Sequence, residues 1–359
     1  MSHAPTLNDI ARVVGVTHMT VSRSFSGKGR VSERTRERVL AAAAELGYRP
    51  NAAAAATRNG RTGYLGMIRS PKQNRSVHAS EFDAGLDQAM HERGLCLLRD
   101  VIDTPLHRGD EDAQAPRIVR ENAVDGLLIN YVFGTPATVR DLIDRCHIPS
   151  FWINRKRDAN CVHPADEGAA REATRFLLDH GHRDPWFVDY AVADADADPD
   201  SEADLSSEEH HYSVADRRVG YARAMRERGL KPRIHTLAPR VRGTYAPGRL
   251  FGECVRLLQR PDRPTAMLCS NEHGRVVAVA ALSLGLRLPD DLSLITFDNH
   301  AASGDDLALD RVLAPHFRMG VTAVTELTEL IAAPGTPRPP VALPFEFHRT
   351  GTVARPRRA

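Results

Sequence analysis

The side chains between positions 17 and 23 are of the types that contact double-stranded DNA. Three of them carry hydroxyl groups that can donate hydrogen bonds to phosphates: Thr17, Thr20 and Ser22. Three others can reach base edges: His18, Met19 and Arg23. Arginine suits the paired acceptors of guanine, and methionine suits the methyl group of thymine. The segment therefore has the chemistry to read a base sequence.

The spacing of apolar residues places this segment on the second of three short helices, over 18–24. Side chains that can cap the three helices precede them: Thr6, Thr17 and Ser32. Asp9 comes close to completing a capping box, and Gly15 interrupts the first helix. The third helix is expected over 33–46 and ends at Gly47, with four residues at core spacing: Val39, Leu40, Ala43 and Leu46. Two short helices at a glycine-containing turn predict a helix-turn-helix, whose second helix enters the major groove.

The charge of the first 62 residues supports this interpretation. They contain ten Lys or Arg and four Asp or Glu, a net charge of +6, whereas the remaining residues sum to −4 and the whole chain to +2. A cationic module on a slightly acidic body is typical of a DNA-binding protein, because its cations replace the counterions of the phosphates. The alternative is a three-helix cap whose basic face is only solvated.

Two runs of sequence in this region resemble the DNA-binding headpiece of the lac repressor and galactose repressor family of bacterial transcription regulators. They are TLNDIARVVGVTHMTVSRSFSG and VSERTRERVLAAAAELGYRPN. The resemblance implies that His18, Met19 and Arg23 read bases. It also implies that a further set of side chains lies near phosphates: Thr6, Thr17, Ser22, Ser26, Arg30, Ser32 and Thr35.

The segment 51–62 departs from the pattern of that family. The resemblance implies a hinge helix that begins at Asn51 and contacts DNA at Ala54, Thr57 and Arg58. Relatives usually place a leucine at the Thr57 position, where it wedges between base pairs in the minor groove. Threonine is smaller and carries a hydroxyl, so a milder bend or compensation by Arg58 is expected. Alternatively, the stretch is only a flexible linker, since short isolated helices are marginal.

From position 64 onward, short apolar runs alternate with helical patterns, which indicates βαβ units around parallel sheets. Strands are expected at 64–68, 95–98, 126–129, 150–153, 185–190, 265–269, 292–297 and 345–348. Helices are expected at 80–93, 136–146, 168–180, 215–228, 249–259, 273–284 and 317–331. These strands are too many for one open sheet, so two similar lobes are predicted. The proline-rich stretch 333–344 can be neither regular helix nor central strand.

Polar side chains follow the predicted strands, where two-lobed α/β proteins bind ligands. They are Asn130, Asn154, Arg155, Asn271, Glu272, Asp298 and Asn299. Arg217 opens a helix, and Phe317 can provide an aromatic face. Amides, a carboxylate and a guanidinium around an aromatic surface suit the hydroxyl groups of a sugar. The alternative is that Asn and Asp end strands because they favour turns.

The resemblance to the same family extends to this body through ADRRVGY, LCSNEHG, LITFDN and PHFRMG. It implies a fold similar to periplasmic sugar-binding proteins. It also implies effector contacts at Asn154, Arg217, Asn271, Asp298 and Phe317, and more loosely at Tyr245. Asn154 stands where Asp is common, and Glu272 stands where Asp usually follows the Asn. The effector is therefore expected to be a sugar, with a nucleoside or another metabolite as the alternative.

The predicted architecture is an N-terminal all-α helix-turn-helix headpiece with a hinge helix, followed by a two-lobed α/β periplasmic-binding-protein-like effector domain. The predicted boundaries are 1–50 for the headpiece, 51–62 for the hinge, 63–350 for the ligand-binding and dimerisation domain, and 351–359 for a basic tail. Within the large domain, the N-lobe is expected over about 63–165 and 315–342, and the C-lobe over about 166–314 and 343–350.

The composition argues against several other classes of protein. No stretch near 18 continuous apolar residues occurs and the N-terminus lacks an apolar signal region, so a soluble, cytoplasmic protein without membrane contact is expected. Five cysteines without a CxxC favour reduced thiols over a disulfide frame or a zinc site. No metal and no cofactor are expected. The acidic stretch 191–211 should form a mobile, solvated loop.

These observations together predict a ligand-responsive transcription repressor that binds a palindromic operator as a homodimer. A sugar-binding transport component would share the two-lobed body, but it requires export. An enzyme working at the crevice would need a catalytic set. The polar residues lack a Ser-His-Asp order, a metal cluster and a glycine-rich phosphate loop after the first strand.

Overall fold

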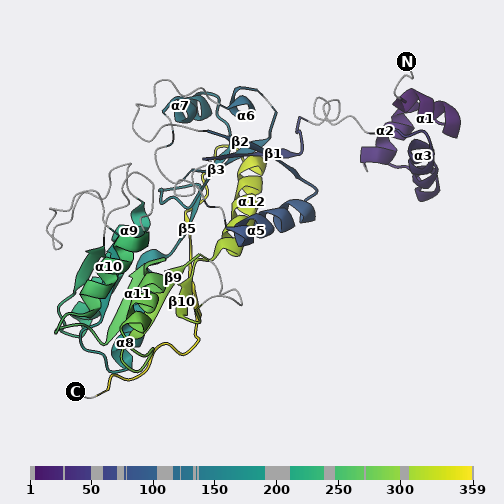
Figure 1. Cartoon of the computed structure of the whole chain (residues 1–359). Helices are drawn as coiled ribbons and strands as arrows, with labels where there is room; N and C mark the ends of the chain where they lie inside the picture. Colours follow the sequence, from purple (N-terminus) through teal and green to yellow (C-terminus); the bar gives the residue numbers. More distant parts are fainter. Residues whose placement is uncertain are drawn as a thin grey trace. The chain divides into compact units, whose positions relative to one another are not determined.

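The computed structural model divides the chain into two compact units, residues 1–63 and 64–359 (Figure 1). It describes residues 5–26, 29–49, 60–70, 77, 79–102, 116–121, 123–131, 135, 137–190, 211–237, 247–270, 272–299 and 307–357. The stretch 50–59, which holds the expected hinge contacts, lies outside the described residues.

The first unit consists of three helices: α1 (Leu7–Val14), α2 (His18–Ser26) and α3 (Glu33–Glu45). Thr6 and Asp9 form a complete capping box at the start of α1. Thr17 Oγ1 and Ser32 Oγ each accept a hydrogen bond of 3.2 Å from a backbone nitrogen three residues on. Gly15 ends α1 with a φ of 74°, in the left-handed region that favours glycine. The three predicted helices and their caps are confirmed.

These helices pack around a small apolar core formed by Ile10, Val14, Val21, Val39, Ala42 and Ala43. Two residues expected in this core lie outside it, since Leu40 is 44% exposed and Leu46 is 37% exposed. Adjacent helical residues point about 100° apart, so Leu40 turns away from the face that holds Val39. Leu46 stands after the last helical turn, as the C-cap of α3.

The second unit contains two six-stranded sheets. The first sheet runs in the order β11-β5-β4-β3-β1-β2 and is parallel throughout: β1 (Tyr64–Arg69), β2 (Cys96–Val101), β3 (Gly126–Asn130), β4 (Ser150–Ile153), β5 (Cys161–Pro164) and β11 (Val341–Leu343). The second runs in the order β12-β10-β9-β8-β6-β7, and its β12 is antiparallel: β6 (Trp186–Tyr190), β7 (Ile234–Leu237), β8 (Ala266–Ser270), β9 (Ser293–Asp298), β10 (Asp310–Leu313) and β12 (Glu346–His348). We call the parts built on the two sheets the N-lobe and the C-lobe.

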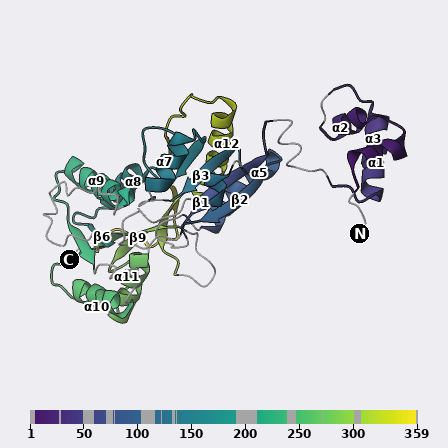
Figure 2. The same cartoon turned by 90° about the horizontal axis from the view of Figure 1, so that it is seen from above.

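Helices cover both faces of each sheet. In the N-lobe, one face is covered by α5 (Ser80–Glu92) and α12 (His316–Ala332), and the other by α6 (Arg117–Arg120) and α7 (Ala137–Arg145). In the C-lobe, one face is covered by α8 (Asp166–Asp179) and α9 (Tyr212–Glu227), and the other by α10 (Pro247–Leu258) and α11 (Glu272–Ser283). Figure 2 shows α8 and α9 on one side of β6 and β9, with α10 and α11 on the opposite side. The expected two-lobed α/β architecture is confirmed.

The chain passes between the lobes three times, after β5, after β10 and after β11. The segment after β12 also belongs to the C-lobe. Its Thr352 hydroxyl donates to the carbonyl of Leu294 at 2.8 Å, and the carbonyl of Ala354 is 2.9 Å from His182 Nε2. Residues expected as a basic tail therefore pack against the C-lobe over part of their length.

All eight strands expected from apolar runs are present, but four short strands were missed: β5, β7, β10 and β11. Each has three or four residues, which is too short to show a period of two. β11 lies within the proline-rich stretch, but at the edge of its sheet. An edge strand tolerates nearby prolines because one side of its backbone needs no partner.

Helices α5 and α12 approach closely because glycines face each other at their crossing. A Cβ on Gly85 would overlap the carbonyl oxygen of Phe317, and a Cβ on Gly320 would overlap that of Phe82. Both obstacles are backbone atoms, so neither can move without displacing a helix. The pairing of these two helices therefore depends on the absence of side chains at both positions.

Gly85→Ala should lower the free energy of unfolding of the second unit by about 1 to 3 kcal/mol, because the added methyl forces the two helices apart. Gly168→Ala on α8 is the matched control, since a Cβ there meets nothing within 4 Å. This change should raise stability by roughly 0.5 to 1 kcal/mol through the helix propensity of alanine. Urea unfolding followed by tryptophan fluorescence measures both, and equal effects of the two substitutions would contradict the packing argument.

Candidate nucleic-acid interface and effector site

The outer face of α2 carries the residues expected to read bases. His18, Met19 and Arg23 are exposed, with Met19 at 59%, and Ser22 is half-buried beside them. The opposite face of the helix is buried through Val21 and Ser24. The helix thus presents one polar, adaptable face while its other face is fixed to the core.

Several hydroxyl groups expected near phosphates are engaged in helix caps. Thr6 Oγ1 lies 2.7 Å from Asp9 Oδ2, Thr17 Oγ1 lies 2.9 Å from Thr20 Oγ1, and Ser32 Oγ lies 2.8 Å from Thr35 Oγ1. These side chains hold the first turns of the three helices, where backbone N–H groups point outward and favour anions. Arg30 is exposed, and Ser26 is the last residue of α2. The remaining expected contacts lie outside the described residues: Asn51, Ala54, Thr57 and Arg58.

The stem of Arg23 lies against Gly29, whose φ is 89°. A Cβ at this glycine would stand 3.1 Å from Arg23 Cδ, so a larger residue would press on the arginine stem. Gly29 therefore allows the backbone to turn with a positive φ, and it leaves room for the side chain of Arg23, which is expected to read guanine.

In the second unit, the structure describes five of the seven residues expected to contact an effector: Asn130, Asn154, Arg217, Asp298 and Phe317. Tyr245 and Asn271 lie outside the described residues. Asn130 ends β3, Asn154 follows β4 and Asp298 ends β9, so all three stand at carboxyl ends of parallel strands. Arg217 lies on α9, and Phe317 lies in the first turn of α12, where it is 41% exposed.

Asn130 has a structural role that the sequence did not indicate. Its side chain is fully buried, and its amide both accepts from the nitrogen of Val77 and donates to the carbonyl of Val77, each at 2.8 Å. These two bonds pair the side-chain amide with the Val77 backbone as a neighbouring strand would, and they fix the chain at Val77 to the end of β3. The amide is therefore engaged with Val77, and the effector contact expected at Asn130 stays a prediction.

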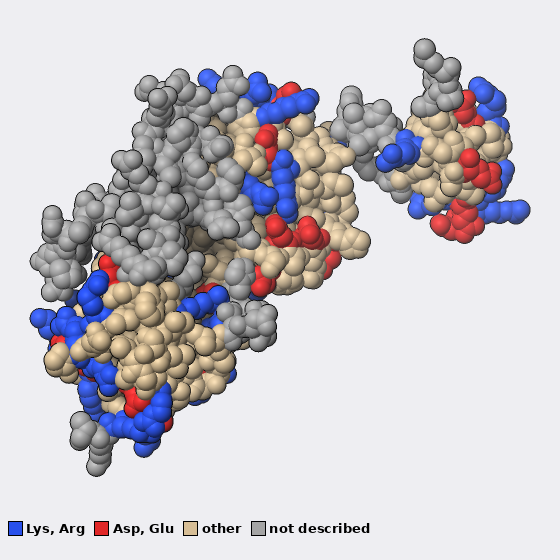
Figure 3. All heavy atoms as spheres, viewed as in Figure 1, with Lys and Arg blue, Asp and Glu red and all other residues tan. Residues whose placement is uncertain are grey.

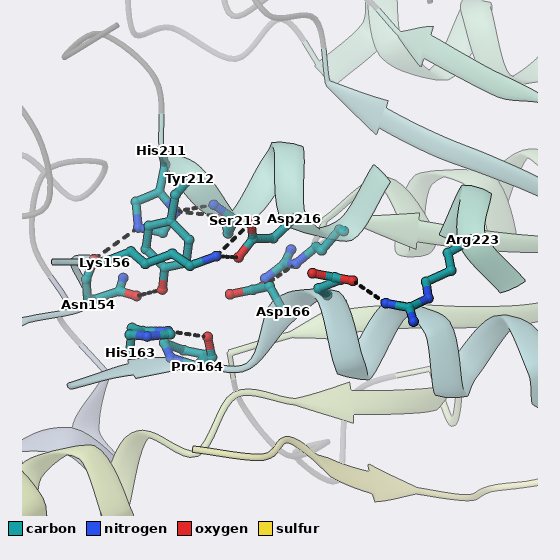
Figure 4. A network of polar contacts seen from close by, with 12 residues as sticks. Asn154, Lys156, His163, Pro164, Asp166, His211, Tyr212, Ser213, Asp216 and Arg223 are labelled. Atoms are coloured by element: carbon teal, nitrogen blue, oxygen red, sulfur yellow. Dashed lines mark hydrogen bonds and ion pairs between the residues drawn. The ribbon is translucent and has the colours of Figure 1, made fainter. Parts of the chain in front are cut away.

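Asn154 joins the two lobes (Figure 4). Its Oδ1 accepts a hydrogen bond of 3.0 Å from the hydroxyl of Tyr212, and its carbonyl accepts one of 3.2 Å from His211 Nε2. Beside it, Lys156 Nζ lies 2.9 Å from Asp216 Oδ2. Asn154 and Lys156 belong to the loop after β4, whereas the other three residues belong to the start of α9. We call these five residues the inter-lobe latch.

Burial keeps the latch largely uncharged. Desolvation lowers the pKa of His211 to about 4, so its imidazole is neutral at pH 7. Its Nδ1 then accepts from Ser213 while Nε2 carries the proton and donates to Asn154. Desolvation also raises the pKa of Tyr212 well above its ordinary value, which keeps the phenol a hydrogen-bond donor. The exposed ion pair between Lys156 and Asp216 carries the only formal charges in these five side chains.

Arg217 is held in place by a buried carboxylate. Its Nε donates to Asp166 Oδ1 at 2.6 Å, and its guanidinium lies 4.3 Å from the centre of the Phe297 ring. Asp166 Oδ2 has no hydrogen-bond partner among the described residues. Burial raises the pKa of Asp166 to about 6, because desolvation outweighs the attraction of Arg217. This pair thus combines an oriented guanidinium with a carboxylate that can gain a proton near neutral pH.

Asp298 is likewise paired before any ligand binds. Its Oδ2 lies 3.1 Å from the buried guanidinium of Arg311 and 3.4 Å from Arg275 Nη2. Removal of this carboxylate would leave a buried cation without its partner, which typically costs about 3 to 5 kcal/mol. Asp298 therefore stabilises the C-lobe, and its replacement tests folding as well as ligand binding.

Sequence reasoning missed five members of this region: Lys156, Asp166, His211, Tyr212 and Asp216. His211 was assigned to the solvated acidic stretch, but it is the N-cap of α9 and accepts from Ser213 N. The signal for Asp166 was its place at the start of α8, two positions after the end of the unrecognised short strand β5. Tyr212 and Lys156 stand next to motif residues but outside the motifs themselves, so no spacing rule identified them.

Two negative observations apply to the described part of the chain. No group of three or more His, Cys, Asp or Glu side chains there could hold a metal ion. No helix there combines the length and apolar character needed to cross a membrane. Figure 3 shows acidic and basic side chains beside one another on both lobes. Ion pairs on the C-lobe include Arg171 with Glu227, at 2.7 Å.

The raised pKa of Asp166 predicts a pH dependence of stability. The folded chain holds this proton more tightly than the unfolded chain, so the contribution of Asp166 is fully present below its ordinary pKa of 3.8 and is lost as the pH rises through about 6. Wild type should therefore lose on the order of 2 kcal/mol relative to Asp166→Asn between about pH 4.5 and about pH 7.5.

Urea unfolding at several pH values measures the difference in free energy of unfolding between wild type and Asp166→Asn. Tryptophan fluorescence reports on the second unit, since both tryptophans, Trp152 and Trp186, lie in it. The exposed substitution Asp87→Asn controls for a change of surface charge. The raised pKa of Asp166 would be contradicted if this difference stayed constant, or if wild type became more stable relative to Asp166→Asn as the pH rises.

Comparison with known proteins adds to these observations. The lacI family of bacterial regulatory proteins matches residues 6–51, and the periplasmic binding protein-like domain matches residues 174–353. The chain is 27% identical over 358 residues to the probable HTH-type transcriptional repressor ExuR of Bacillus subtilis (strain 168), with 98% of each chain covered. It is 29% identical over 303 residues to the HTH-type transcriptional regulator AglR of Rhizobium meliloti (strain 1021), with 82% of this chain and 77% of the relative covered.

Among solved structures, the lac repressor dimer bound to operator and the anti-inducer ONPF matches with a TM-score of 0.71 at 22% identity, covering 98% of this chain and 100% of the other. The complex of the transcriptional regulator CelR with cellobiose matches with a TM-score of 0.60 at 21% identity, covering 97% and 99%. At these identities the likeness shows the fold. Since a lacI-type headpiece precedes a binding-protein-like body and the relatives matched over most of their length are transcription regulators, the chain belongs to the lacI family of DNA-binding bacterial regulators.

Proposed function

We propose that the protein is a homodimeric transcription repressor that binds a palindromic operator and responds to a small molecule held between its lobes. The observation that carries this proposal is the exposed face of α2, which presents His18, Met19 and Arg23 on a unit with a net charge of +6. Repression is inferred from relatives whose names state it, such as ExuR of Bacillus subtilis.

The headpiece would read DNA through two different kinds of contact. Arg23 suits the paired acceptors of a guanine, and Met19 suits the methyl group of a thymine. Arg30 and the N-terminal turns of the three helices would contact phosphates, which fixes the register without reading sequence. Replacement of Arg23 should therefore change specificity, whereas replacement of Arg30 should change only the overall affinity.

The effector would bind beside the latch and the Arg217–Asp166 pair. The pair offers a planar guanidinium and a carboxylate oxygen without a hydrogen-bond partner among the described residues, and the latch offers the amide of Asn154. The half-exposed ring of Phe317 is a further expected contact. Such a set suits a neutral, hydroxyl-rich molecule, because each hydroxyl can both donate and accept. We therefore favour a sugar as the effector, and a nucleoside is the second candidate because a base could stack on Phe317.

Ligand binding would act on DNA by changing how the lobes close. The latch joins the loop after β4 to the start of α9, so any molecule that strengthens or breaks these contacts shifts the lobes relative to each other. In a dimer this movement would alter the spacing of the two headpieces. The coupling must be reciprocal, so operator binding changes the affinity for the effector by the same factor, typically ~1 to 3 kcal/mol.

An exposed apolar pair on α11 supports a dimer. Val279 is 48% exposed and Leu282 is 51% exposed, and residues three apart lie side by side on a helix. Large apolar side chains that adjoin on a surface mark a contact with another chain more often than isolated ones do. We propose that a second copy of this chain covers this pair, with the two-fold symmetry that a palindromic operator requires.

Arg23→Ala should weaken binding to a selected operator by about 1 to 3 kcal/mol and relax the preference at one base pair of each half-site. Operators are first selected from random duplexes by the wild-type protein, and affinities are then measured by fluorescence anisotropy at several salt concentrations. Arg30→Ala is the comparison: it should weaken binding to all sequences and reduce the salt slope by about 1. If the selected fragments lack an inverted repeat, or if Arg23→Ala binds them as tightly as wild type, the DNA-reading assignment fails.

Leu282→Lys should convert the dimer to monomers at micromolar concentration, because it places a charge in the centre of an apolar contact. Val219→Lys on α9 is the matched control, since Val219 is 53% exposed but stands apart from the pair on α11. Sedimentation velocity measures the oligomeric state of both variants. A Leu282→Lys protein that remains dimeric would show that α11 is not the dimer contact.

A further inference from the structure

A cleft of about 750 Å³ opens on the N-lobe, and none of the C-lobe latch residues lines it. It lies between α7, β4 and the loop that connects β4 to β5. Its polar and aromatic lining includes Arg140, Asp144, Trp152, Lys156, Arg157 and Asp158. None of the residues expected to contact the effector lines this cleft. The cleft therefore requires an explanation separate from the effector site.

Arg157 is fixed in the cleft without a carboxylate. Its guanidinium lies 4.5 Å from the centre of the Trp152 ring, and it makes no hydrogen bond or ion pair with another described residue. Trp152 itself is only 6% exposed, so the ring forms a rigid support. An arginine placed over a ring still offers its planar N–H fork, which matches the two oxygens of a carboxylate or phosphate.

Two carboxylates stand on the same cleft. Asp144 and Asp158 line it, and neither side chain forms an ion pair or a hydrogen bond with another described residue. Carboxylates without protein partners can accept hydrogen bonds from the hydroxyl groups of a ligand. The lining thus combines a site for an oxyanion with acceptors for neighbouring hydroxyls, within a volume suited to a small metabolite.

Lys156 connects the cleft to the latch. Its side chain lines the cleft, and the same ammonium group pairs with Asp216 of the C-lobe at 2.9 Å. The Lys156 side chain is 51% exposed, so its ammonium can turn toward either partner. An anion in the cleft would compete with Asp216 for this one cation.

We propose that the cleft is a second binding site, for a small hydroxylated metabolite that carries a carboxylate or phosphate. The oxyanion binds the fork of Arg157 and the ammonium of Lys156, and its hydroxyls donate to Asp144 and Asp158. Occupancy of the cleft draws Lys156 from Asp216 and loosens the latch. Binding to the cleft does not depend on whether the chain binds DNA. An effect of the bound molecule on operator affinity, through the loosened latch, rests on the proposed function.

Trp152 provides the readout. The chain has two tryptophans, so Trp186→Phe leaves Trp152 as the only one, directly beneath Arg157. This protein is titrated with glycerol 3-phosphate and with malate, against potassium chloride at equal ionic strength and against glycerol. We expect a saturable change in emission with at least one of the two oxyanions, and none with chloride or glycerol. A saturable response to only one of them identifies phosphate or carboxylate as the preferred group.

Arg157→Gln in the same background should weaken the response about tenfold or more, because it removes a charge-assisted pair of hydrogen bonds. Arg349→Gln is the matched control, since Arg349 also lies 4.5 Å from an aromatic ring, that of Phe176, but outside the cleft. Arg157→Lys keeps the charge without the planar fork and should give an intermediate affinity. Thermal unfolding confirms that each variant is folded.

The link to the latch has its own test. Asp216→Asn releases Lys156 from its ion pair, so the same probe should bind about twofold to fivefold more tightly than to the parent protein. A merely structural role of Lys156 would leave this affinity unchanged. The proposal is overturned if no oxyanion gives a saturable response, if chloride gives the same response, or if Arg157→Gln binds as well as Arg349→Gln.

Discussion

Parallel pairing of strands is the constraint on which the second unit depends. Within each sheet the parallel strands all run the same way, so their carboxyl ends meet at one edge and their connections must return across a face. This geometry brings Asn154, after β4, within reach of Tyr212 at the start of α9, although 57 residues separate the two positions along the chain. A small number of hydrogen bonds between the lobes then suffices to fix their closure.

The buried charges near that edge are almost all neutralised locally. Asp298 pairs with Arg311, Arg217 pairs with Asp166, and His211 stays uncharged because burial lowers its pKa. A buried ion pair adds little net stability, since desolvation offsets much of the attraction, but loss of one partner is costly. Such pairs hold guanidinium and carboxylate groups in fixed orientations while the net charge of each pair stays zero. A ligand at the proposed effector site would therefore be recognised by geometry more than by electrostatic attraction.

The sequence predicted the headpiece in detail because its helices are locally determined. Thr6, Thr17 and Ser32 cap the three helices by contacts within four residues, and such contacts leave a pattern in the sequence. Leu40 and Leu46 were misassigned because apolar character alone does not reveal which side of a helix faces a neighbour. The two lobes followed from alternating strands and helices, whereas β5, β7, β10 and β11 were too short to be recognised.

The site was predicted less completely because its members act across long separations. Asn130 has the residue type of a ligand contact, but only the structure shows that Val77 occupies its amide. Asp166 and Tyr212 gain their importance from partners in other elements, Arg217 and Asn154, and no local pattern records those pairings. Motif resemblance identified Arg217 and Asn154 themselves, but not the residues that orient them.

The late position of α12 and β11 in the chain affects how the protein can be made. The N-lobe begins at Tyr64, yet its sheet lacks an edge strand until Leu343 has been synthesised, and the C-lobe needs β12 and Thr352. Neither lobe can close its core on the ribosome until almost the whole polypeptide has emerged, whereas the headpiece core is complete once Tyr48 has been synthesised. A nascent or prematurely terminated chain would therefore carry a finished DNA-binding headpiece on a body whose two lobes have not yet folded.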